Sequence, residues 1–232
     1  MAICLSLEDA TFAFDKFLPV LEKVRLEIEA GECFGVFGPA GGGKTTLMKV
    51  LAGILRLQSG HRRCHVSKIS MAFQRGALFD SLTVFENLAF PLRELKIVPR
   101  TQIHERVYAS LVEVGLEGCE KKMAVELSGG QQKRLALSRA FITEPDLLLL
   151  DDPAAGLDPV TSREMIDLIR RIRKKSLSIV VASSDPVQVL EVSDRVGMFH
   201  KGNFVKIGRP SEINSSSQVL DFLRGSPEST ND

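Results

Sequence analysis

The glycine-rich stretch at residues 38–45 constrains the fold of this chain more than any other part of its sequence. It fits the pattern G-x-x-x-x-G-K-[ST] and reads Gly38, Pro39, Ala40, Gly41, Gly42, Gly43, Lys44 and Thr45. A short apolar strand is expected before it at 33–37, and apolar residues at three- and four-residue steps predict a helix over 47–55. A strand, a glycine turn and a helix in this order bring backbone N–H groups and a helix N-terminus around a phosphate group. The stretch therefore predicts a phosphate-binding loop, in which Lys44 reaches the β- and γ-phosphates and the Thr45 hydroxyl binds Mg²⁺.

Apolar segments later in the chain predict the sheet that carries this loop. Strands are expected at 69–73, 147–150 and 179–182. The last two are apolar throughout, which is typical of strands covered on both faces in a parallel sheet. Asp151 directly follows the second strand, where its carboxylate can hold Mg²⁺ through water. The fold class is therefore α/β with a mainly parallel sheet.

The remaining pattern divides the chain into a core, an inserted helical block and a polar tail. Alternating apolar residues predict strands at 5–14 and 24–28, and a hairpin is expected over 196–207. Between 85 and 142 the apolar spacing is helical, so this block interrupts the alternation of strands and helices. The predicted units are one domain at 1–225, made of a core at about 1–75 and 143–210 and a helical subdomain at about 76–142, and a flexible tail at 226–232.

Charge and hydropathy exclude several classes of protein. Lys and Arg number 30 against 29 Asp and Glu, which leaves a formal charge of +1, whereas nucleic-acid-binding proteins carry a basic excess. No segment approaches the roughly 18 to 20 apolar residues that span a bilayer, and the N-terminus lacks the basic start of a signal peptide. The four cysteines have no paired spacing, which is typical of free thiols in a reducing compartment. We therefore expect a cytoplasmic chain that does not bind nucleic acid and reaches a membrane only through a partner.

A second motif, Leu-Ser-Gly-Gly-Gln at 127–131, opens a helix shortly before the strand that ends at Asp151. Ser128 is placed as an N-cap, and the N–H groups of the first helical turn favour an anion. Together with the glycine-rich loop, this motif resembles the ATP-binding cassette family over nearly the whole chain. The resemblance implies a P-loop NTPase (RecA-like) core with an N-terminal antiparallel β-subdomain and an inserted helical subdomain. It also implies ATP and Mg²⁺ as cofactors, and two ATP molecules held between two such chains.

The resemblance also implies roles for single residues. Phe14 matches the aromatic residue that stacks on adenine, and Gln74 matches the glutamine that contacts Mg²⁺ and the attacking water. The motif at 127–131 matches the signature that contacts ATP bound to the other subunit, and Asp158 matches the loop between the subunits. The implied ATP-binding residues are Phe14, Gly38, Pro39, Ala40, Gly41, Gly42, Gly43, Lys44, Thr45, Thr46, Ser128, Gly129, Gly130 and Gln131. The implied Mg²⁺ ligands are Thr45, Gln74 and Asp151, and the implied catalytic residues are Lys44, Gln74, Asp152 and Ser184.

A narrower resemblance concerns the run from Phe73 to Glu94, with a late segment at 219–225. Both are similar to the Mla-type (Mce-linked) cassettes, which energise the movement of phospholipids or other lipids across the bacterial envelope. This resemblance implies transmembrane permease subunits that dock near residues 74–91, at the cytoplasmic face of the inner membrane. It also implies a second ATP-binding subunit, with a homodimer favoured over a heterodimer. Importers of amino acids or other small solutes are the alternative, since their cassettes share all the other motifs.

Three departures from the family pattern bear on activity. Asp152 stands where the family has a glutamate that polarises the attacking water. The missing methylene withdraws the carboxylate by roughly 1.5 Å. A displacement of about 1 Å at a reacting group can lower the reaction rate by about 10²-fold. Ser184 replaces the switch histidine and cannot become cationic. The segment 61–68 is shorter than the family's β-segment, which predicts a reduced β-subdomain. Active ATP hydrolysis is the favoured interpretation. The alternative is that the chain is a catalytically weakened, ATP-binding regulatory half of a heterodimer. The altered residues would act on the nucleotide bound by this chain, whereas the intact signature would act on the nucleotide bound by a partner.

Two further groups of residues receive structural interpretations. His61, Cys64 and His65 match no zinc-site spacing, so a solvated loop is expected there. Cys33 lies in an apolar strand and is expected to be a core residue, not a nucleophile.

Overall fold

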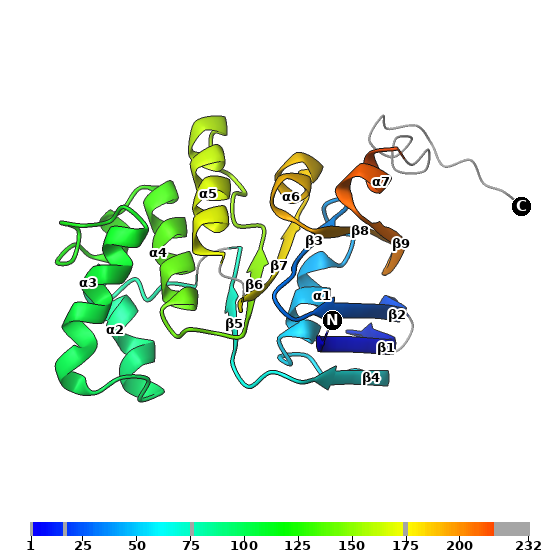
Figure 1. Cartoon of the computed structure of the whole chain (residues 1–232), viewed down its shortest axis with the longest axis horizontal. Coiled ribbons are helices and arrows are strands. Elements are labelled where there is room, and N and C mark those ends of the chain that lie inside the picture. The colour runs from blue at the N-terminus through cyan, green and yellow to red at the C-terminus, as the bar shows by residue number, and fades with distance from the viewer. Residues whose placement is uncertain (1, 16–17, 75–76, 174–175, 216–232) are drawn as a thin grey trace, which may run out of the picture.

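The structure is a computed structural model that describes residues 2–15, 18–74, 77–173 and 176–215. In this part of the chain the strands form two sheets with helices packed around them (Figure 1). The larger sheet has the order β5-β6-β7-β3-β8-β9 and the smaller one the order β2-β1-β4. The strands are β1 (Ile3–Ala13), β2 (Pro19–Glu29), β3 (Cys33–Phe37), β4 (Ser59–Cys64), β5 (Ile69–Ala72), β6 (Leu147–Asp151), β7 (Ser178–Ser183), β8 (Arg195–His200) and β9 (Asn203–Gly208).

The larger sheet is parallel except at one edge. Its neighbouring strands from β5 to β8 pair in parallel, and β9 joins β8 as an antiparallel hairpin across Lys201 and Gly202. The smaller sheet is antiparallel throughout, with β1 paired to both β2 and β4. The predicted α/β class, the mainly parallel sheet and the antiparallel N-terminal sheet are therefore confirmed.

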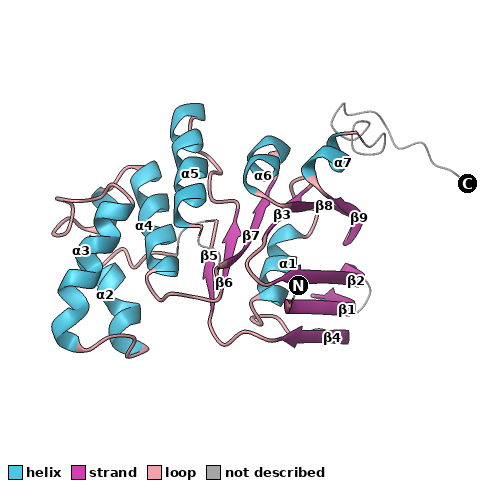
Figure 2. Ribbon diagram, in the orientation of Figure 1, coloured by secondary structure: helices cyan, strands magenta, loops and turns pink. Residues whose placement is uncertain are grey.

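Helices cover both faces of the larger sheet, as Figure 2 shows in cyan around the magenta strands. Short α1 lies between this sheet and the small antiparallel sheet, whereas α2, α3 and α4 stand together at the opposite end of the molecule (Figure 1). The helices are α1 (Lys44–Leu51), α2 (Val84–Glu94), α3 (Ile103–Glu113), α4 (Gly129–Phe141), α5 (Pro159–Ile172), α6 (Pro186–Val192) and α7 (Pro210–Asn214), with 3₁₀ turns at Arg100–Gln102 and Ala124–Glu126.

The four leucines of β6 explain this layering. All four are fully buried, but Leu147 and Leu149 join a cluster with α1, β1 and β2, whereas Leu148 and Leu150 join a cluster with α2 to α5. Successive side chains of a strand point to opposite faces, so an uninterrupted apolar run requires cover on both sides. Cys33 lies fully buried in β3, where burial raises the pKa of its thiol to about 12, and the expected core role is confirmed.

The segment after Gly60 differs from the solvated loop expected there. Residues 59–64 form β4, an edge strand that pairs with β1. The pattern was misleading because His61 and Arg63 are exposed and the strand contains no apolar residue apart from Cys64. The Arg62 side chain, by contrast, is directed toward α1. Its guanidinium donates hydrogen bonds of 3.0 and 2.7 Å to the Leu51 carbonyl oxygen at the end of that helix. A cation at a helix C-terminus satisfies carbonyls that have no partner within the helix.

Two expectations fall outside the described residues: the flexible tail at 226–232 and the late segment at 219–225. Among the residues that are described, no helix combines the length and apolar character that crossing a membrane requires.

Candidate nucleotide site

Strand register brings the predicted residues to one edge of the larger sheet. Ala72 pairs with Leu150, Asp151 with Ala182, and Phe37 with Ser183, so β5, β6, β7 and β3 end level with one another. In an open parallel sheet, ligands bind beyond the carboxyl ends of the strands. A cavity of about 430 Å³ lies there, lined by Phe14, Val20, Ala40, Gly41, Gly43, Lys44, Thr45, Thr46, Gln74, Asp151, Asp152 and Ser184. Eleven of these twelve residues were predicted from the sequence, and Val20 was not.

The loop before α1 needs glycine at two positions for different reasons. A Cβ on Gly38 would lie 1.9 Å from the carbonyl oxygen of Phe199 in β8, so only glycine fits between the strands. Gly43 has a φ of +95°, in the left-handed region that side chains disfavour. The loop therefore approaches β8 closely and then turns sharply into α1. Pro39 and Gly42 belong to this turn, in which the Gly42 amide donates to the Pro39 carbonyl oxygen at 3.1 Å.

Lys44 is buried at the base of the loop. Its Nζ donates to the carbonyl oxygens of Gly38 and Pro39, both at 2.8 Å. Burial lowers the pKa of the Lys44 ammonium group, and the nearby carboxylates of Asp152 and Asp151 oppose this shift. The two carbonyl oxygens accept hydrogen bonds from this ammonium group but carry no net charge. A phosphate bound in the cavity would supply the negative charge that balances it.

The N-terminus of α1 also fits an anion. Its N-cap residue, Gly43, offers no side-chain acceptor to the first helical turn, and that turn contains no acidic residue. By contrast, the Ser128 side chain accepts from one first-turn amide of α4, and the Asp158 side chain accepts from two first-turn amides of α5. The first-turn donors of α1 therefore face the cavity without a side-chain partner, as phosphate binding requires.

Thr45 and Asp151 form the part of the site that fits Mg²⁺. The Thr45 hydroxyl donates to Asp151 Oδ1 at 3.2 Å, although the two residues are 106 positions apart. Asp151 is only 3% exposed, and burial raises the pKa of its carboxyl group. A hydroxyl beside a buried carboxylate is an oxygen donor set of the kind Mg²⁺ uses next to phosphates. Gln74 lines the same cavity from the chain that follows β5.

Asp152 has a defined position beside this pair. Its backbone is left-handed, with a φ of +49°, and its amide donates to the Ala182 carbonyl oxygen at 2.7 Å. One carboxylate oxygen accepts a hydrogen bond of 3.0 Å from the Ser183 hydroxyl. Ser184 follows at the cavity wall and is exposed. The carboxylate in the family's glutamate position is thus present and held by a neighbouring strand.

Lys133 was missed by the sequence analysis. Its Nζ donates to the carbonyl oxygen of Gln74 at 2.8 Å and to that of Asp152 at 3.3 Å. Burial lowers the pKa of Lys133, and the carboxylates of Asp152 and Asp151 oppose the shift. The only signal in the sequence was its place two residues after the predicted signature. Through Lys133, a residue that no motif includes, α4 contacts the backbone of both Gln74 and Asp152.

The signature residues lie apart from this cavity. Ser128 caps α4 by accepting from the Gln131 amide at 3.3 Å, and the Gln131 side chain accepts from the Ser128 amide at 3.0 Å. Ser128 and Gly129 are exposed. A Cβ on Gly130 would lie 2.6 Å from Thr161 in α5, which explains glycine there. Gly129 borders a second cavity together with Gln74 and Gly156, and no residue of the signature is among those that line the cavity at the phosphate loop.

Phe14 stands at the other side of the cavity. Its ring is 70% exposed and contacts Phe12 edge-on, with ring centroids 4.9 Å apart. An exposed aromatic ring that is held by a second ring can stack on a planar base. Phe14 lies at the cavity wall, and its adenine-stacking role stays a prediction.

Replacing Asp151 with asparagine should raise the melting temperature of the nucleotide-free protein by about 2 °C. The pKa of the Asp151 carboxyl group is raised, which means that the folded state binds the carboxyl proton more tightly than the unfolded state does. Stability from this group is therefore present below the unfolded pKa and lost as pH rises through the folded pKa, so the charged carboxylate destabilises the fold at neutral pH. Asparagine removes that charge and retains the acceptor for Thr45. Differential scanning calorimetry at pH 7 measures the change.

The same variant should lose the additional thermal stabilisation that Mg²⁺ gives in the presence of ATP, because a carboxylate ligand is absent. Melting curves with ATP and either Mg²⁺ or EDTA test this. A lower melting temperature for the nucleotide-free variant, or an unchanged response to Mg²⁺, would contradict the assignment.

Comparison with known proteins agrees with this geometry. A family model described as "ABC transporter" matches residues 21–155. The chain is 36% identical over 223 residues to the spermidine/putrescine import ATP-binding protein PotA of Thermotoga maritima, covering 91% of this chain and 60% of the relative. It is 33% identical over 224 residues to the intermembrane phospholipid transport system ATP-binding protein MlaF of Haemophilus influenzae, covering 89% of this chain and 85% of the relative.

A solved structure is also similar: cbiO1 of Clostridium perfringens, part of the cbiONQ ABC transporter complex, with a TM-score of 0.83 and 27% identity. It covers 95% of this chain and 93% of that one. The chain thus spans about 60% of the length of PotA and most of the length of MlaF and cbiO1. The match to the family model covers more than half of the chain and includes the phosphate loop, the signature and the Asp151 strand. The chain therefore belongs to the ABC transporter family.

Proposed function

We propose that this chain binds and hydrolyses MgATP as the ATP-binding subunit of an ABC transporter, and that it drives lipid transport by separate membrane subunits. One observation carries the proposal. The phosphate loop with Thr45, the adjacent Asp151 and Asp152, and Gln74 come from three different segments and line one cavity. Membership of the family supports the same activity.

The residues that line the cavity would have different roles in phosphoryl transfer. Lys44 and the first-turn amides of α1 bind the phosphates and stabilise charge that develops on the transferred group. Thr45, Asp151 and Gln74 would hold Mg²⁺, which neutralises phosphate charge when bound. Asp152, held by Ser183, orients the attacking water and accepts its proton. Phe14 stacks on the base and contributes to binding only.

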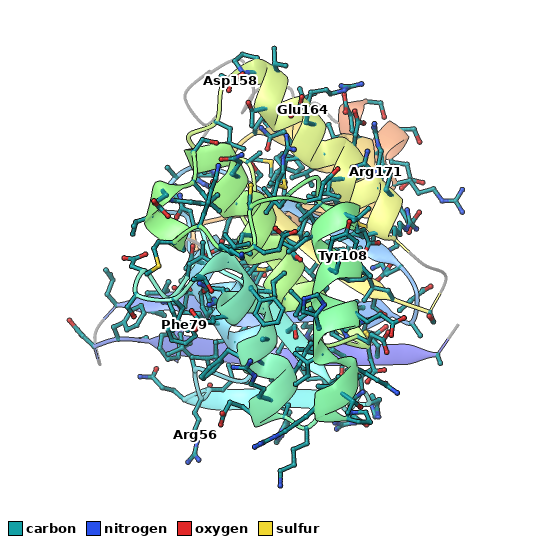
Figure 3. The ribbon with its side chains drawn as sticks, turned by 90° about the vertical axis from the view of Figure 1, so that its left-hand side faces the viewer. Arg56, Phe79, Tyr108, Asp158, Glu164 and Arg171 are labelled. Carbon is teal, nitrogen blue, oxygen red and sulfur yellow. The ribbon has the colours of Figure 1, made fainter. Side chains whose placement is uncertain are left out.

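A second ATP-binding subunit is part of the proposal, because the signature is remote from the chain's own phosphate loop. Ser128 and Gly129 are exposed at the N-terminus of α4, where they would contact ATP held by the other subunit. Asp158 is exposed at the start of α5, where Figure 3 shows it at one end of that helix. Its carboxylate accepts from the amides of Val160 and Thr161. Hydrogen bonding by the Thr161 side chain, followed by these amides, lowers the pKa of Asp158. We propose a homodimer, and a heterodimer remains the alternative.

The membrane subunits are proposed to dock on the segment after Gln74. Asn87 is fully buried and donates to the carbonyl oxygens of Phe79, Leu82 and Thr83, which fixes the loop before α2. The loop presents Phe79, which is exposed and packs on exposed Phe90 with ring centroids 4.8 Å apart. Figure 3 shows Phe79 on the face formed by the helical block. Exposed aromatic residues on a rigid loop favour a protein partner, and the partner would hold the chain at the cytoplasmic face of the inner membrane.

Lipid is the proposed substrate class because the run from Phe73 to Glu94 resembles the Mla-type cassettes and because MlaF is a relative over most of its length. Import of a small solute is the alternative, since PotA is a relative with a similar identity. Copurification of the chain with its native membrane subunits, followed by mass spectrometry of bound lipids, separates the two. Phospholipid enriched over an empty-membrane control supports the first, and its absence supports the second.

A weakened regulatory subunit is the second candidate function, favoured by Asp152 and Ser184 in the place of the family's glutamate and histidine. Steady-state phosphate release tests it against the main proposal. We expect wild-type turnover above that of a blank, and a rise of less than about tenfold in the Asp152→Glu, Ser184→His double variant. A rise of several orders of magnitude from a silent wild type would support the regulatory function instead.

A further inference from the structure

The carboxylate of Asp152 is held by a residue outside every motif named above. Ser183 lies at the end of β7, next to the end of β6, because Asp151 pairs with Ala182 in the parallel register. Its hydroxyl donates to Asp152 Oδ1 at 3.0 Å. The side chain of Ser183 is 2% exposed, so water does not compete freely for this hydrogen bond.

Ser183 is itself part of a chain of polar side chains that leads to α5. Its hydroxyl lies 3.3 Å from Gln188 Oε1, and Gln188 Nε2 lies 3.1 Å from the Ser162 hydroxyl. The backbone amide of Asp185 donates to the Ser183 hydroxyl at 3.1 Å. Ser162 lies in the first turns of α5, and its amide donates to the carbonyl oxygen of Asp158 at 2.8 Å. The polar chain therefore connects Asp152 to the helix that begins at Asp158.

The number of protons limits how this chain can be arranged. The Ser183 hydroxyl has one proton, so it can donate either to Asp152 or to Gln188 Oε1, but not fully to both. If it donates to Asp152, the Gln188 amide turns over, because oxygen and nitrogen of an amide are interchangeable in shape. Gln188 then donates to Ser183 and accepts from Ser162. All hydrogen bonds in that arrangement point toward the Asp152 carboxylate, which strengthens the last one.

We propose that Ser183 is a positioning residue for Asp152, supported by Gln188 and Ser162, and that it fixes the shorter carboxylate for the attacking water. The inference rests on the proposed ATP hydrolysis. An unheld aspartate would rotate about its side-chain bonds, and a displacement of about 1 Å at a reacting group can cost about 10²-fold in rate. The hydroxyl removes that freedom. Because Ser162 lies in α5, which begins at Asp158, the direction of the hydrogen bonds that lead to Asp152 also depends on the position of α5.

A purely structural role is the competing explanation. Ser183 accepts from the Asp185 amide at the start of α6, so its removal could act through the fold alone. Ser178 provides the matched control. It lies at the other end of the same strand, is also 2% exposed, and its hydroxyl accepts from the Gly31 amide at 2.9 Å. Ser178→Ala removes a buried hydroxyl from β7 without a contact to Asp152.

The test is steady-state phosphate release as a function of ATP concentration. For Ser183→Ala we expect kcat to fall between about tenfold and hundredfold, with an unchanged KM for ATP. Ser183→Thr, which retains the hydroxyl, should keep at least half of wild-type kcat, and Ser178→Ala should match the wild type. In an Asp152→Glu background the longer carboxylate extends past Ser183, so Ser183→Ala should change kcat less than twofold. Equal losses in both backgrounds, or a wild-type kcat in Ser183→Ala, would overturn the inference.

Crystal structures of the wild type and of Ser183→Ala give a readout that does not need activity. We expect the Asp152 carboxylate within hydrogen-bond distance of Ser183 in the wild type and rotated away in the variant. An identical Asp152 orientation in both would overturn the inference, whatever the rate. A wild type that releases no phosphate although Asp152 is held as described would contradict the proposed function and leave the positioning role of Ser183 supported.

Discussion

Replacing Lys44 with alanine is expected to lower kcat for ATP hydrolysis by at least about 10² to 10³-fold. The Lys44 ammonium group is buried at the cavity wall, with two of its three donors on the Gly38 and Pro39 carbonyl oxygens. In the proposed reaction a cation there would stabilise the charge that develops on the transferred phosphoryl group, and alanine removes this cation without a substitute. Binding of ATP should also weaken, because a charge-assisted hydrogen bond to the phosphates is lost.

Loss of activity in this variant should not come from unfolding. Burial lowers the pKa of Lys44, so its charge destabilises the fold below the folded pKa, and its removal should not reduce the melting temperature. Lys49→Ala is the matched control, because it removes the same charge from the last turn of the same helix. Phosphate release and calorimetry on both variants provide the measurement. Lys44→Ala turnover above a tenth of the wild-type value would exclude the role assigned to this residue.

The second large effect is expected at Asp152. In Asp152→Asn, kcat should fall by about 10² to 10⁴-fold, whereas the affinity for ATP should stay within about threefold of wild type. The amide can accept the Ser183 hydrogen bond but cannot take a proton from water. ATP binding with little hydrolysis should lead to an ATP-bound dimer that accumulates.

Phosphate release, equilibrium binding of a labelled ATP and size-exclusion chromatography with ATP give the three readouts. Asp167→Asn serves as the control, since the Asp167 side chain is half-exposed on α5 and pairs only with Arg170 three residues later among the contacts described for it. Hydrolysis by Asp152→Asn within threefold of the wild-type rate would show that another group activates the water.

Much of the fold followed from local patterns. The glycine-rich stretch and the strand before it were predicted, and the structure has Cys33–Phe37 there. The helix after it is also present but spans Lys44–Leu51, so the predicted end at residue 55 was wrong, and Gly53 turns the chain with a φ of +76°. The hairpin of β8 and β9 was predicted from two apolar runs around Lys201 and Gly202 and is confirmed. Strand β4 was missed, because an edge strand with charged side chains does not bury an apolar face.

Strand order could not be predicted from the same patterns. β3 lies between β7 and β8 in the sheet, although both of these strands are far from β3 in the sequence. Hydrophobic periodicity identifies a strand, but it does not say which strand lies beside it. For the same reason the hydroxyl that holds Asp152 was not foreseen. Ser183 is 31 residues away from Asp152 in the chain. The role implied for its neighbour Ser184 did not indicate that the Ser183 hydroxyl would contact that carboxylate.

The sequence by itself determined which chemical groups this protein has: a glycine turn and a lysine proposed to bind phosphates, a hydroxyl and a carboxylate proposed to hold Mg²⁺, and a second carboxylate one methylene shorter than the family's glutamate. Only the tertiary structure decided how these groups stand toward one another. It placed Lys133 on the backbone of Gln74 and Asp152, and Ser183 on the carboxylate of Asp152. The reason is that residue chemistry and helix or strand preference are local properties. The distance between residues far apart in the chain is set by strand register and by helices packed on the sheet.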